Sequence, residues 1–196
     1  MKKSNKVIES FFDNLAPTWD NAQDREEFKF ALIDQLGLKE GNRVLDLACG
    51  TGVVTQKIQS ITKTKVTALD ISKNMIEIAK SKCQNPEIDF RVGDFYEFNE
   101  TNYDYIVILN AYPHFLDLEG LKKKLHETLK CGGRVAIIHA CGREELNSHH
   151  TAHAMNVSRM LNSVDEEAKF YSDCFKIIKK EEDNNHYILI LEKIRF

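Results

Sequence analysis

The 196-residue sequence lacks the features that mark several large classes of protein. It contains no apolar run long enough for a membrane span or for the core of a signal peptide, so residence in the cytoplasm is expected. Its five cysteines include no CxxC pair, which favours reduced, buried thiols over a disulfide framework. The formal net charge of −3 offers no positive excess for binding long nucleic acid. A protein that acts on small molecules fits better, and neither a membrane nor a nucleic acid is expected as a partner.

A hydrophobic strand followed by a glycine turn is the most informative stretch of the chain. Residues 44–52 read Val-Leu-Asp-Leu-Ala-Cys-Gly-Thr-Gly, and the apolar run is typical of a buried parallel strand. Gly50 and Gly52 allow backbone torsions and a close ligand approach that a side chain would block. With a helix predicted over 53–61, the stretch indicates a nucleotide cradle at the start of a helix.

Acidic residues follow the next two predicted strands. Asp70 closes the strand over 65–70, at a distance from the glycines where a carboxylate can accept both hydroxyls of a ribose. Asp94 follows the strand over 88–92, where a carboxylate can accept a hydrogen bond from an exocyclic amine such as that of adenine. Capping of its own turn is the alternative role for Asp94. The order of the glycine turn, Asp70 and Asp94 favours binding of a nucleoside.

Helices and strands alternate along the chain, which predicts an α/β fold with a mostly parallel sheet. Further helices are expected at 4–15, 24–36, 72–82 and 118–130, further strands at 103–110 and 134–139, and an antiparallel hairpin from 170–178 and 186–193 around a charged turn at 179–185. Pro17 is expected to break the first helix, and Cys131-Gly132-Gly133 to form a turn before the fifth strand.

Taken together, these motifs resemble those of the class I S-adenosylmethionine-dependent methyltransferases that act on small molecules. Residues 44–52 match the family's first motif, Asp70 in Leu-Asp-Ile-Ser its ribose acid, and Asp94 its adenine-side acid. Gly132 and Gly133 match its late glycine turn. The resemblance implies a Rossmann-like, seven-stranded, mostly parallel sheet with a C-terminal antiparallel hairpin and helices on both faces.

The resemblance also implies which residues surround S-adenosylmethionine, the methyl donor. Asp46 and the backbone of Gly50 to Gly52 would hold the methionine part, Ile71 would pack on adenine, and Asn110 would lie near the sulfonium centre. The full implied set is Trp19, Asp46, Ala48, Gly50, Thr51, Gly52, Asp70, Ile71, Asp94, Phe95 and Asn110. A single domain over 1–196 is expected, with a helical cap (1–40), a cofactor-binding core (41–140) and a substrate-side helix with the hairpin (141–196).

Residues 11–20 are similar to the segment before the first motif in ubiquinone and menaquinone C-methyltransferases, where Trp19 replaces a common Tyr. Trp19 is therefore either a core residue or a lid over the ligand. A dinucleotide fingerprint fits less well, because Thr55 stands where its third glycine would be. Residues 110–113, Asn-Ala-Tyr-Pro, depart from the Asn/Asp-Pro-Pro-aromatic motif of amino-methylating nucleic-acid enzymes, which disfavours DNA or RNA as the acceptor.

The segment from His139 to His153 carries four of the seven histidines. Helical spacing places Arg143, Asn147 and His150 on one face, which His139 could meet from the end of the strand before it. This suggests an acceptor pocket in which a histidine is the base or a ligand and Arg143 draws an anionic group. The packed face would consist of Leu146, Val157 and Leu161. The alternatives are a solvated helix face beside a structural histidine, and a metal site using His139 with His150, or with His149 and His153.

Catalysis by such a protein would consist mainly of positioning, because a sulfonium is already a good electrophile. A base is needed only for an acceptor that must lose a proton, and the candidates are His114, Tyr112, His139 and His150. A noncatalytic regulatory module that binds S-adenosylmethionine or S-adenosylhomocysteine is the alternative function. The expected partner is a small-molecule acceptor, and the expected assembly is a monomer or a homodimer.

Overall fold

The structure is a computed structural model that describes residues 3–22, 25–153 and 156–194. Within these ranges, side chains are described except at positions 3, 4, 22 and 149–153. The chain forms two compact units, Met1–Asn99 and Glu100–Phe196. No helix in the described ranges is long and apolar enough to cross a membrane.

The first unit is built on three parallel strands. β2 (Val66–Asp70) pairs with both β1 (Val44–Leu47) and β3 (Ile88–Val92), in agreement with the predicted strands. Every residue of β1 and β2 is buried, as the apolar runs predict. The helices described in this unit are α1 (Lys3–Trp19), η1 (Asp20–Ala22), α2 (Glu26–Asp34), α3 (Thr55–Thr62), α4 (Lys73–Lys82) and η2 (Phe95–Glu97).

Helix α4 fixes the loop that follows β2. Its N-cap Ser72 accepts a hydrogen bond from the N–H of Met75 at 3.1 Å, which confirms the predicted cap. The buried apolar cluster of this region consists of Ala68, Ile76, Ala79, Cys83, Ile88 and Phe90. Because these side chains come from β2, α4, the turn after it and β3, their packing holds the helix against the strands.

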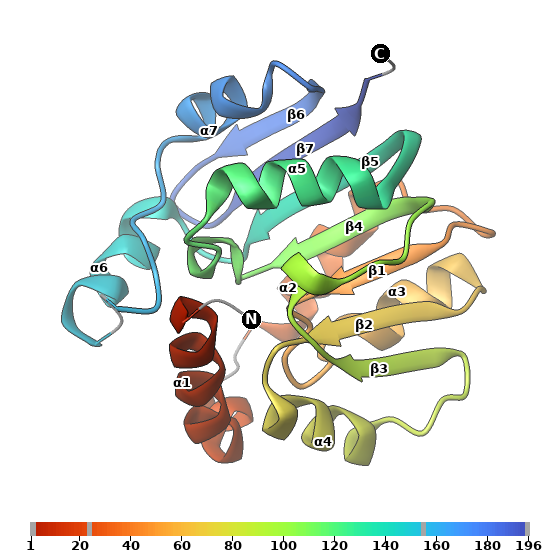
Figure 1. The fold of residues 1–196 in the computed structure, drawn as a ribbon, viewed down its shortest axis with the longest axis vertical. Coiled ribbons are helices and arrows are strands. Elements are labelled where there is room, and N and C mark those ends of the chain that lie inside the picture. The colour runs from red at the N-terminus through yellow and green to blue at the C-terminus, as the bar shows by residue number, and fades with distance from the viewer. Residues whose placement is uncertain (1–2, 23–24, 154–155, 195–196) are drawn as a thin grey trace. The chain divides into compact units, whose positions relative to one another are not determined.

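Helix α1 continues through Pro17 to Trp19, so the predicted break at Pro17 is wrong. A proline inside a helix removes one backbone donor and leaves the carbonyl four residues earlier, here that of Asp13, without its usual partner. The side-chain amide of Asn74 donates to this Asp13 carbonyl at 3.0 Å. A residue of α4 therefore replaces the missing donor, and Figure 1 shows the two helices side by side.

The second unit combines a parallel pair of strands with an antiparallel hairpin. β4 (Tyr103–Leu109) runs parallel to β5 (Leu129–His139), and β7 (Tyr187–Lys193) runs antiparallel to both β5 and β6 (Phe175–Glu182). The helices described here are η3 (Tyr112–His114), α5 (Leu118–Thr128), α6 (Arg143–His153) and α7 (Val164–Tyr171). The seven strands follow the order β3-β2-β1-β4-β5-β7-β6, which confirms the predicted Rossmann-like α/β fold with a C-terminal antiparallel hairpin.

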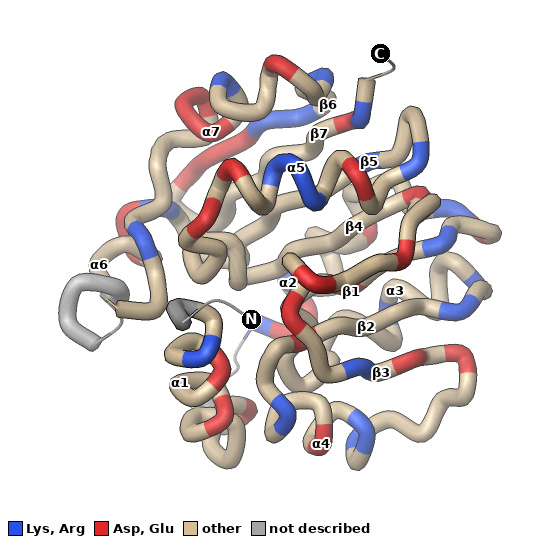
Figure 2. The backbone as a smooth tube through the Cα atoms, in the orientation of Figure 1, with Lys and Arg blue, Asp and Glu red and all other residues tan. Residues whose placement is uncertain are grey.

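Two boundaries in the second unit differ from the sequence predictions. The expected glycine turn at 131–133 lies inside β5, where the register with β4 shifts and Gly132 has a φ of +73°. The expected strand at 170–178 begins only at Phe175, because a capping box between Ser163 and Glu166 starts α7 and carries it to Tyr171. β6 then continues to Glu182, so most of the expected charged turn is strand, and its charges of both signs are visible in Figure 2.

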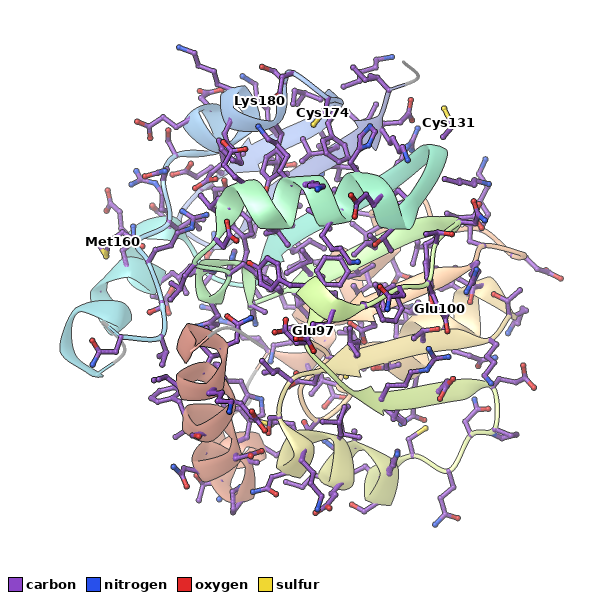
Figure 3. All side chains as sticks on the ribbon, in the orientation of Figure 1. Glu97, Glu100, Cys131, Met160, Cys174 and Lys180 are labelled. Atoms are coloured by element: carbon purple, nitrogen blue, oxygen red, sulfur yellow. The ribbon has the colours of Figure 1, made fainter. Side chains whose placement is uncertain are left out.

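All five cysteines are free thiols, in agreement with the absence of a disulfide framework. The expectation that each is buried is wrong, since only Cys83 is buried and Cys131 is exposed. Figure 3 labels Cys131 near the start of β5 and Cys174 next to β6.

A buried ionic network stabilises the second unit. Glu167 of α7, which is 1% exposed, accepts a hydrogen bond from the hydroxyl of Tyr112 at 2.6 Å and one from Nη1 of Arg159 at 2.7 Å. The guanidinium of Arg159 also lies 4.6 Å from the ring centroid of Tyr112. The network therefore joins three parts of the unit: η3, the segment between α6 and α7, and α7 itself.

Replacing Glu167 with Ala should destabilise the protein strongly, because the change leaves the charge of Arg159 buried without its partner. The expected loss is about 3–5 kcal/mol in the free energy of unfolding, measured by urea denaturation. The control is Glu127→Ala, which removes an exposed carboxylate paired with Lys123 on α5 and should cost about 0.5 kcal/mol or less. Similar losses for the two variants would contradict the role given to the network.

Candidate active site

The glycine turn after β1 runs through left-handed backbone. Gly50 and Gly52 have φ angles of +54° and +78°, and Ala48 has +57°. The N–H of Gly52 donates to the carbonyl of Cys49 at 2.9 Å, and the N–H of Cys49 donates to the carbonyl of Leu69 at 3.2 Å. The first bond closes the turn, and the second joins it to the end of β2. Glycine stands at two of the positions with positive φ, where it is favoured over other residues.

Asp70 is held against this turn by its own carboxylate. Oδ2 accepts a hydrogen bond from the N–H of Gly50 at 2.8 Å, and Oδ1 accepts one from the N–H of Ser72 at 2.8 Å. Burial raises the pKa of Asp70 to about 6, although these backbone hydrogen bonds oppose the rise. Each carboxylate oxygen has a second lone pair for a donor such as a ribose hydroxyl, so the geometry fits the predicted role.

Asp46 lies inside β1 and is 1% exposed. Its Oδ2 accepts a hydrogen bond from Oγ1 of Thr55 at 2.6 Å. Burial raises the pKa of Asp46 to about 7, and the negative charge of Asp70 adds to the rise. Thr55 occupies the position of the third glycine in a dinucleotide fingerprint, and its hydroxyl makes a bond here that glycine could not make.

Asp94 has the turn-capping role considered from the sequence, and it also accepts a hydrogen bond from the N-terminal helix. Its Oδ1 accepts a hydrogen bond from the N–H of Tyr96 at 3.0 Å and so caps η2. Its Oδ2 accepts one from the side-chain amide of Asn5 at 2.7 Å. The neighbouring Phe95 is buried. The carboxylate thus binds an N–H donor of the kind that the amine of adenine would supply.

Trp19 ends α1 beside the glycine turn. Its Nε1 lies 3.7 Å from the position that a Cβ on Gly50 would occupy. The ring of Phe12 packs edge-on against the indole, with the centroids 5.7 Å apart. Asp20 follows directly as the first residue of η1, and its Oδ1 accepts a hydrogen bond from Oγ1 of Thr51 at 2.6 Å. The N-terminal helix therefore contacts the turn directly.

The members of the predicted cofactor set that belong to the first unit lie in β1, at the end of β2, after the ends of the three strands and, for Trp19, at the end of α1. They are Trp19, Asp46, Ala48, Gly50, Thr51, Gly52, Asp70, Ile71, Asp94 and Phe95. The remaining member, Asn110, lies in the second unit after β4, with a φ of +56°. Its N–H donates to the carbonyl of Ile138, and its Oδ1 accepts from the N–H of Ala140, both at 2.8 Å. These bonds join the ends of β4 and β5.

Tyr112 is not suited to act as a base, which corrects the sequence assignment. Its side chain is fully buried, and its hydroxyl already donates to Glu167 at 2.6 Å. Burial raises the pKa of the phenol, and the nearby Tyr171 and Glu167 raise it further. Tyr112 instead anchors η3 to α7.

The candidate histidines of the second unit differ in their surroundings. His114 is half-buried, and its Nδ1 lies 2.9 Å from the carbonyl oxygen of Val157. This contact favours the tautomer with a proton on Nδ1 and a lone pair on Nε2, which suits a base. His139 is fully buried at the end of β5, with its ring packed edge-on against Tyr187 at 6.0 Å between centroids. Packing of that kind is typical of a structural histidine.

The expected polar face of α6 is used largely by protein partners. Nε of Arg143 donates to Oε1 of Glu182 at 2.6 Å. The side-chain amide of Asn147 donates to the carbonyl of Leu161 at 2.9 Å and accepts from its N–H at 2.8 Å. Asn147 is thus corrected from a substrate contact to an anchor for the chain after α6. Val157 and Leu161 lie beyond the end of the helix and not on its packed face.

The remaining histidine assignments concern side chains outside the described ones, namely those of His149, His150 and His153. Among the described residues, no group of three or more His, Cys, Asp or Glu side chains is arranged to hold a metal ion. The role of His150 as a base or pocket residue stays a prediction.

The sequence reasoning missed the polar residues of α1 and η1 that contact the strand-end loops. Asp13 falls inside the helix predicted over 4–15, but the predicted break at Pro17 separated it from Asp20, so no local pattern linked the two residues. The pairing of Arg159 with Glu167 was missed as well, because nothing local in the sequence connects them.

Comparison with known proteins agrees with this geometry. Residues 44–133 match the family model described as "Methyltransferase domain". The chain is 33% identical over 134 residues to a malonyl-[acyl-carrier protein] O-methyltransferase of Priestia megaterium, covering 65% of this chain and 49% of that protein. Residues 44–133 are therefore similar to a methyltransferase domain. The matched stretch runs from the first residue of β1 to β5 and includes the glycine turn, Asp70 and Asp94.

Two further comparisons extend the likeness, one in sequence and one in fold. The ubiquinone/menaquinone biosynthesis C-methyltransferase UbiE of Geotalea uraniireducens is 28% identical over 153 residues, covering 70% of this chain and 65% of that protein. A solved structure titled "DhpI-SAH complex structure" has the same fold, with a TM-score of 0.78, 18% identity and coverage of 98% of both chains. The chain spans 49% and 65% of the lengths of the two curated relatives named here.

The close packing at Gly52 predicts a larger cost for a side chain there than at Gly132. A Cβ on Gly52 would lie 3.0 Å from Cε1 of Phe90, whereas one on Gly132 would meet nothing within 4 Å, and both glycines have positive φ. Gly132→Ala should therefore cost about 1 kcal/mol for backbone strain, and Gly52→Ala about 2–4 kcal/mol for strain and overpacking together. Urea denaturation measures both, and equal costs would show that the contact with Phe90 is easily relieved.

The buried carboxyl of Asp46 predicts a pH dependence of stability. Its pKa is about 7 in the folded protein and near 3.8 when unfolded, so the folded state binds the proton more tightly. This group's contribution to stability is therefore largest at low pH and falls as the pH rises from about 4 to about 7.

Asp46→Asn keeps an oxygen for the hydroxyl of Thr55 and removes the titration. The variant should lose up to about 1.4 kcal/mol per pH unit of the downward slope in unfolding free energy. The measurement is urea denaturation at a series of pH values between 5 and 7.5. Glu40→Gln, which removes a charge from an exposed turn, is the control and should keep the slope of the original protein. An unchanged slope in Asp46→Asn would contradict the assignment.

Proposed function

We propose that this protein transfers the methyl group of S-adenosylmethionine to a small-molecule acceptor. The observation that supports the proposal is the hydrogen bond from the N–H of Gly50 to Asp70, because it joins a buried carboxylate, a suitable acceptor for ribose hydroxyls, to the glycine turn. When bound, S-adenosylmethionine supplies a methyl group on a sulfonium, which is already activated for transfer. The protein's own contribution is then to bind, orient and exclude water.

The proposed cofactor contacts follow the strand ends. Asp70 would accept hydrogen bonds from the ribose hydroxyls, and Asp94 would accept one from the amine of adenine. The backbone of Gly50 to Gly52 would face the methionine part. Ile71 and Phe95 offer apolar surface for the adenine ring, and Trp19 covers the glycine turn. Asp46, fixed by Thr55, is proposed as an acceptor for the amino group at the methionine end of the ligand. Asn110 is proposed near the sulfonium.

The names of the relatives suggest the kind of acceptor. They describe O-methylation of a malonyl group and C-methylation in quinone biosynthesis, reactions at oxygen or carbon nucleophiles. By analogy, we propose that the acceptor of this protein is a group whose oxygen or carbon becomes nucleophilic when it loses a proton. His114 is the base that fits best, since its Nδ1 is directed at the carbonyl of Val157 and Nε2 carries the lone pair. Arg143 and His150 stay proposed contacts to an anionic acceptor, and a cytoplasmic location stays a prediction.

Calorimetry with S-adenosylhomocysteine tests the cofactor site. The unaltered protein should bind it, and Asp70→Ala should weaken binding by about 100-fold or more, because hydrogen bonds to a charged group are lost. The matched control is Asp89→Ala, which removes a half-exposed acid of β3 paired with Arg91. This variant should change the affinity by less than about threefold, because the acid is not a proposed cofactor contact. Binding of a nicotinamide dinucleotide without binding of either S-adenosyl ligand would refute the proposal.

Turnover of labelled S-adenosylmethionine against a panel of hydroxyl, carboxylate and enolisable acceptors tests the reaction. His114→Gln should keep the affinity for S-adenosylhomocysteine and lower turnover by about 100-fold, the usual contribution of a general base. Tight cofactor binding with no transfer to any member of the panel would favour the noncatalytic regulatory module.

A further inference from the structure

The N-terminal helix contacts the loops after all three strands of the first unit. We call α1 and η1 together (residues 3–22) the N-terminal clamp. Polar contacts of the clamp with these loops include Asn5 with Asp94 after β3, Asp13 with the Ser72 loop after β2, and Asp20 with Thr51 after β1. Each contact lies at a loop that carries a proposed cofactor residue, although none of the three clamp residues belongs to the predicted cofactor set.

The contact at Asp20 fixes the glycine turn and Trp19. Oδ1 of Asp20 accepts a hydrogen bond from Oγ1 of Thr51 at 2.6 Å, and Oδ2 accepts one from Nζ of Lys82 at 3.0 Å. Nζ of Lys82 also lies 3.3 Å from Oγ1 of Thr51, which closes a triangle. Because Asp20 directly follows Trp19, this triangle holds the indole beside Gly50.

The contact at Asp13 fixes the loop that contains the N-cap of α4. Oδ1 of Asp13 accepts hydrogen bonds from Oγ of Ser72 at 2.6 Å and from the N–H of Asn74 at 3.0 Å. The backbone carbonyl of Asp13, released by Pro17, accepts a third from the side chain of Asn74. Ser72 in turn donates its N–H to Asp70, so Asp13 is one residue removed from the proposed ribose acid.

The contact at Asn5 differs from the other two because it involves a proposed ligand group. Oδ1 of Asp94 is taken by the N–H of Tyr96, and Oδ2 accepts the amide N–H of Asn5 at 2.7 Å. Asn5 is 6% exposed and Asp94 is 9% exposed, so the pair is closed off from solvent. An amide N–H and the exocyclic amine of adenine are the same kind of donor. The oxygen has a second lone pair, but the buried Asn5 side chain fills the space beside it, so the amine has to displace Asn5 to reach the oxygen.

We propose that Asp13 and Asp20 are positioning residues that hold the clamp on the cofactor loops, and that Asn5 occupies Asp94 until the amine of adenine replaces it. The inference rests on the proposed function, since it takes Asp94 as the adenine-side acid. The two halves of the clamp have opposite effects on binding. Asp13 and Asp20 favour the cofactor by ordering the loops, whereas Asn5 opposes it by competition.

Four variants measured by calorimetry with S-adenosylhomocysteine test the proposal. Asp13→Ala and Asp20→Ala should each weaken binding by about 5- to 30-fold, the loss expected for a charge-assisted hydrogen bond. Asn5→Ala should tighten binding by about 3- to 10-fold, because the ligand's amine no longer displaces a donor. Asn14→Ala removes an exposed amide from the same helix and should leave the affinity unchanged.

A second ligand shows whether competition occurs at the amine. S-inosylhomocysteine carries an oxygen in place of the adenine amine, so it cannot donate to Asp94 there. The gain from Asn5→Ala should be absent with this ligand, and the losses from Asp13→Ala and Asp20→Ala should persist. An equal gain with both ligands would overturn the assignment of Asn5.

Fluorescence separates positioning from a general loss of structure. Trp19 is the only tryptophan of the chain, so its emission reports on the clamp alone. Addition of S-adenosylhomocysteine at saturation should change the emission of the unaltered protein and of Asn5→Ala, and this change should be much smaller in Asp20→Ala. Asp20→Asn, which keeps an acceptor for Thr51, should restore part of the response and serves if the Ala variant does not fold.

Several outcomes would overturn the proposal. Weaker binding in Asn5→Ala would show that Asn5 is only a structural contact, and unchanged binding in both Asp variants would show that they do not position the loops. Failure of the unaltered protein to bind any S-adenosyl ligand would instead refute the proposed function. The two failures are therefore distinguishable.

Discussion

The hydrogen bond from the N–H of Gly50 to the carboxylate of Asp70 is the interaction on which the first unit's site depends. It joins the turn after β1 to the end of β2, and it requires both a left-handed glycine and a buried acid. The second oxygen of Asp70 binds the N–H of Ser72, and the hydroxyl of Ser72 binds Asp13. A continuous series of hydrogen bonds thus runs from the glycine turn through the start of α4 to the N-terminal helix.

The two units handle buried charge differently. Glu167 meets a cation and a phenol in the second unit, so its negative charge is balanced by protein partners. Asp46 and Asp70 in the first unit meet only hydroxyl and backbone donors in the contacts described above, and burial raises their pKa values. A protein interior tolerates such carboxylates at a cost in stability. That cost is consistent with acids retained for a ligand instead of for folding.

The sequence was sufficient for features that depend on local patterns. The apolar run of 44–47, the alternation over 88–92 and the Ser72 cap are formed as predicted, because burial and capping are decided by neighbouring residues. The aromatic pair Phe170 and Tyr171 suggested a strand, whereas the capping box at Ser163 started a helix that included both. Local β preference was outweighed there by the helix start and by packing.

Contacts between distant positions could not be predicted in the same way. Asn5 and Asp94 are 89 residues apart, and Thr51 and Asp20 are 31 apart, so only the folded chain brings them together. Tyr112 illustrates the opposite error. Its position after β4 suggested a catalytic base. In the folded chain its hydroxyl donates a hydrogen bond to the buried carboxylate of Glu167, so its role is structural.

The helix that continues through Pro17 has a consequence for how substitutions combine. The carbonyl of Asp13 depends on the Asn74 side chain because position 17 has no N–H to offer. In a chain with alanine at position 17, a backbone donor becomes available, and Asn74 loses that task. The effects of changes at positions 17 and 74 are therefore not additive, so each position limits which residues the other can accept. A proline thus makes a residue of a different helix part of α1's own backbone hydrogen bonding.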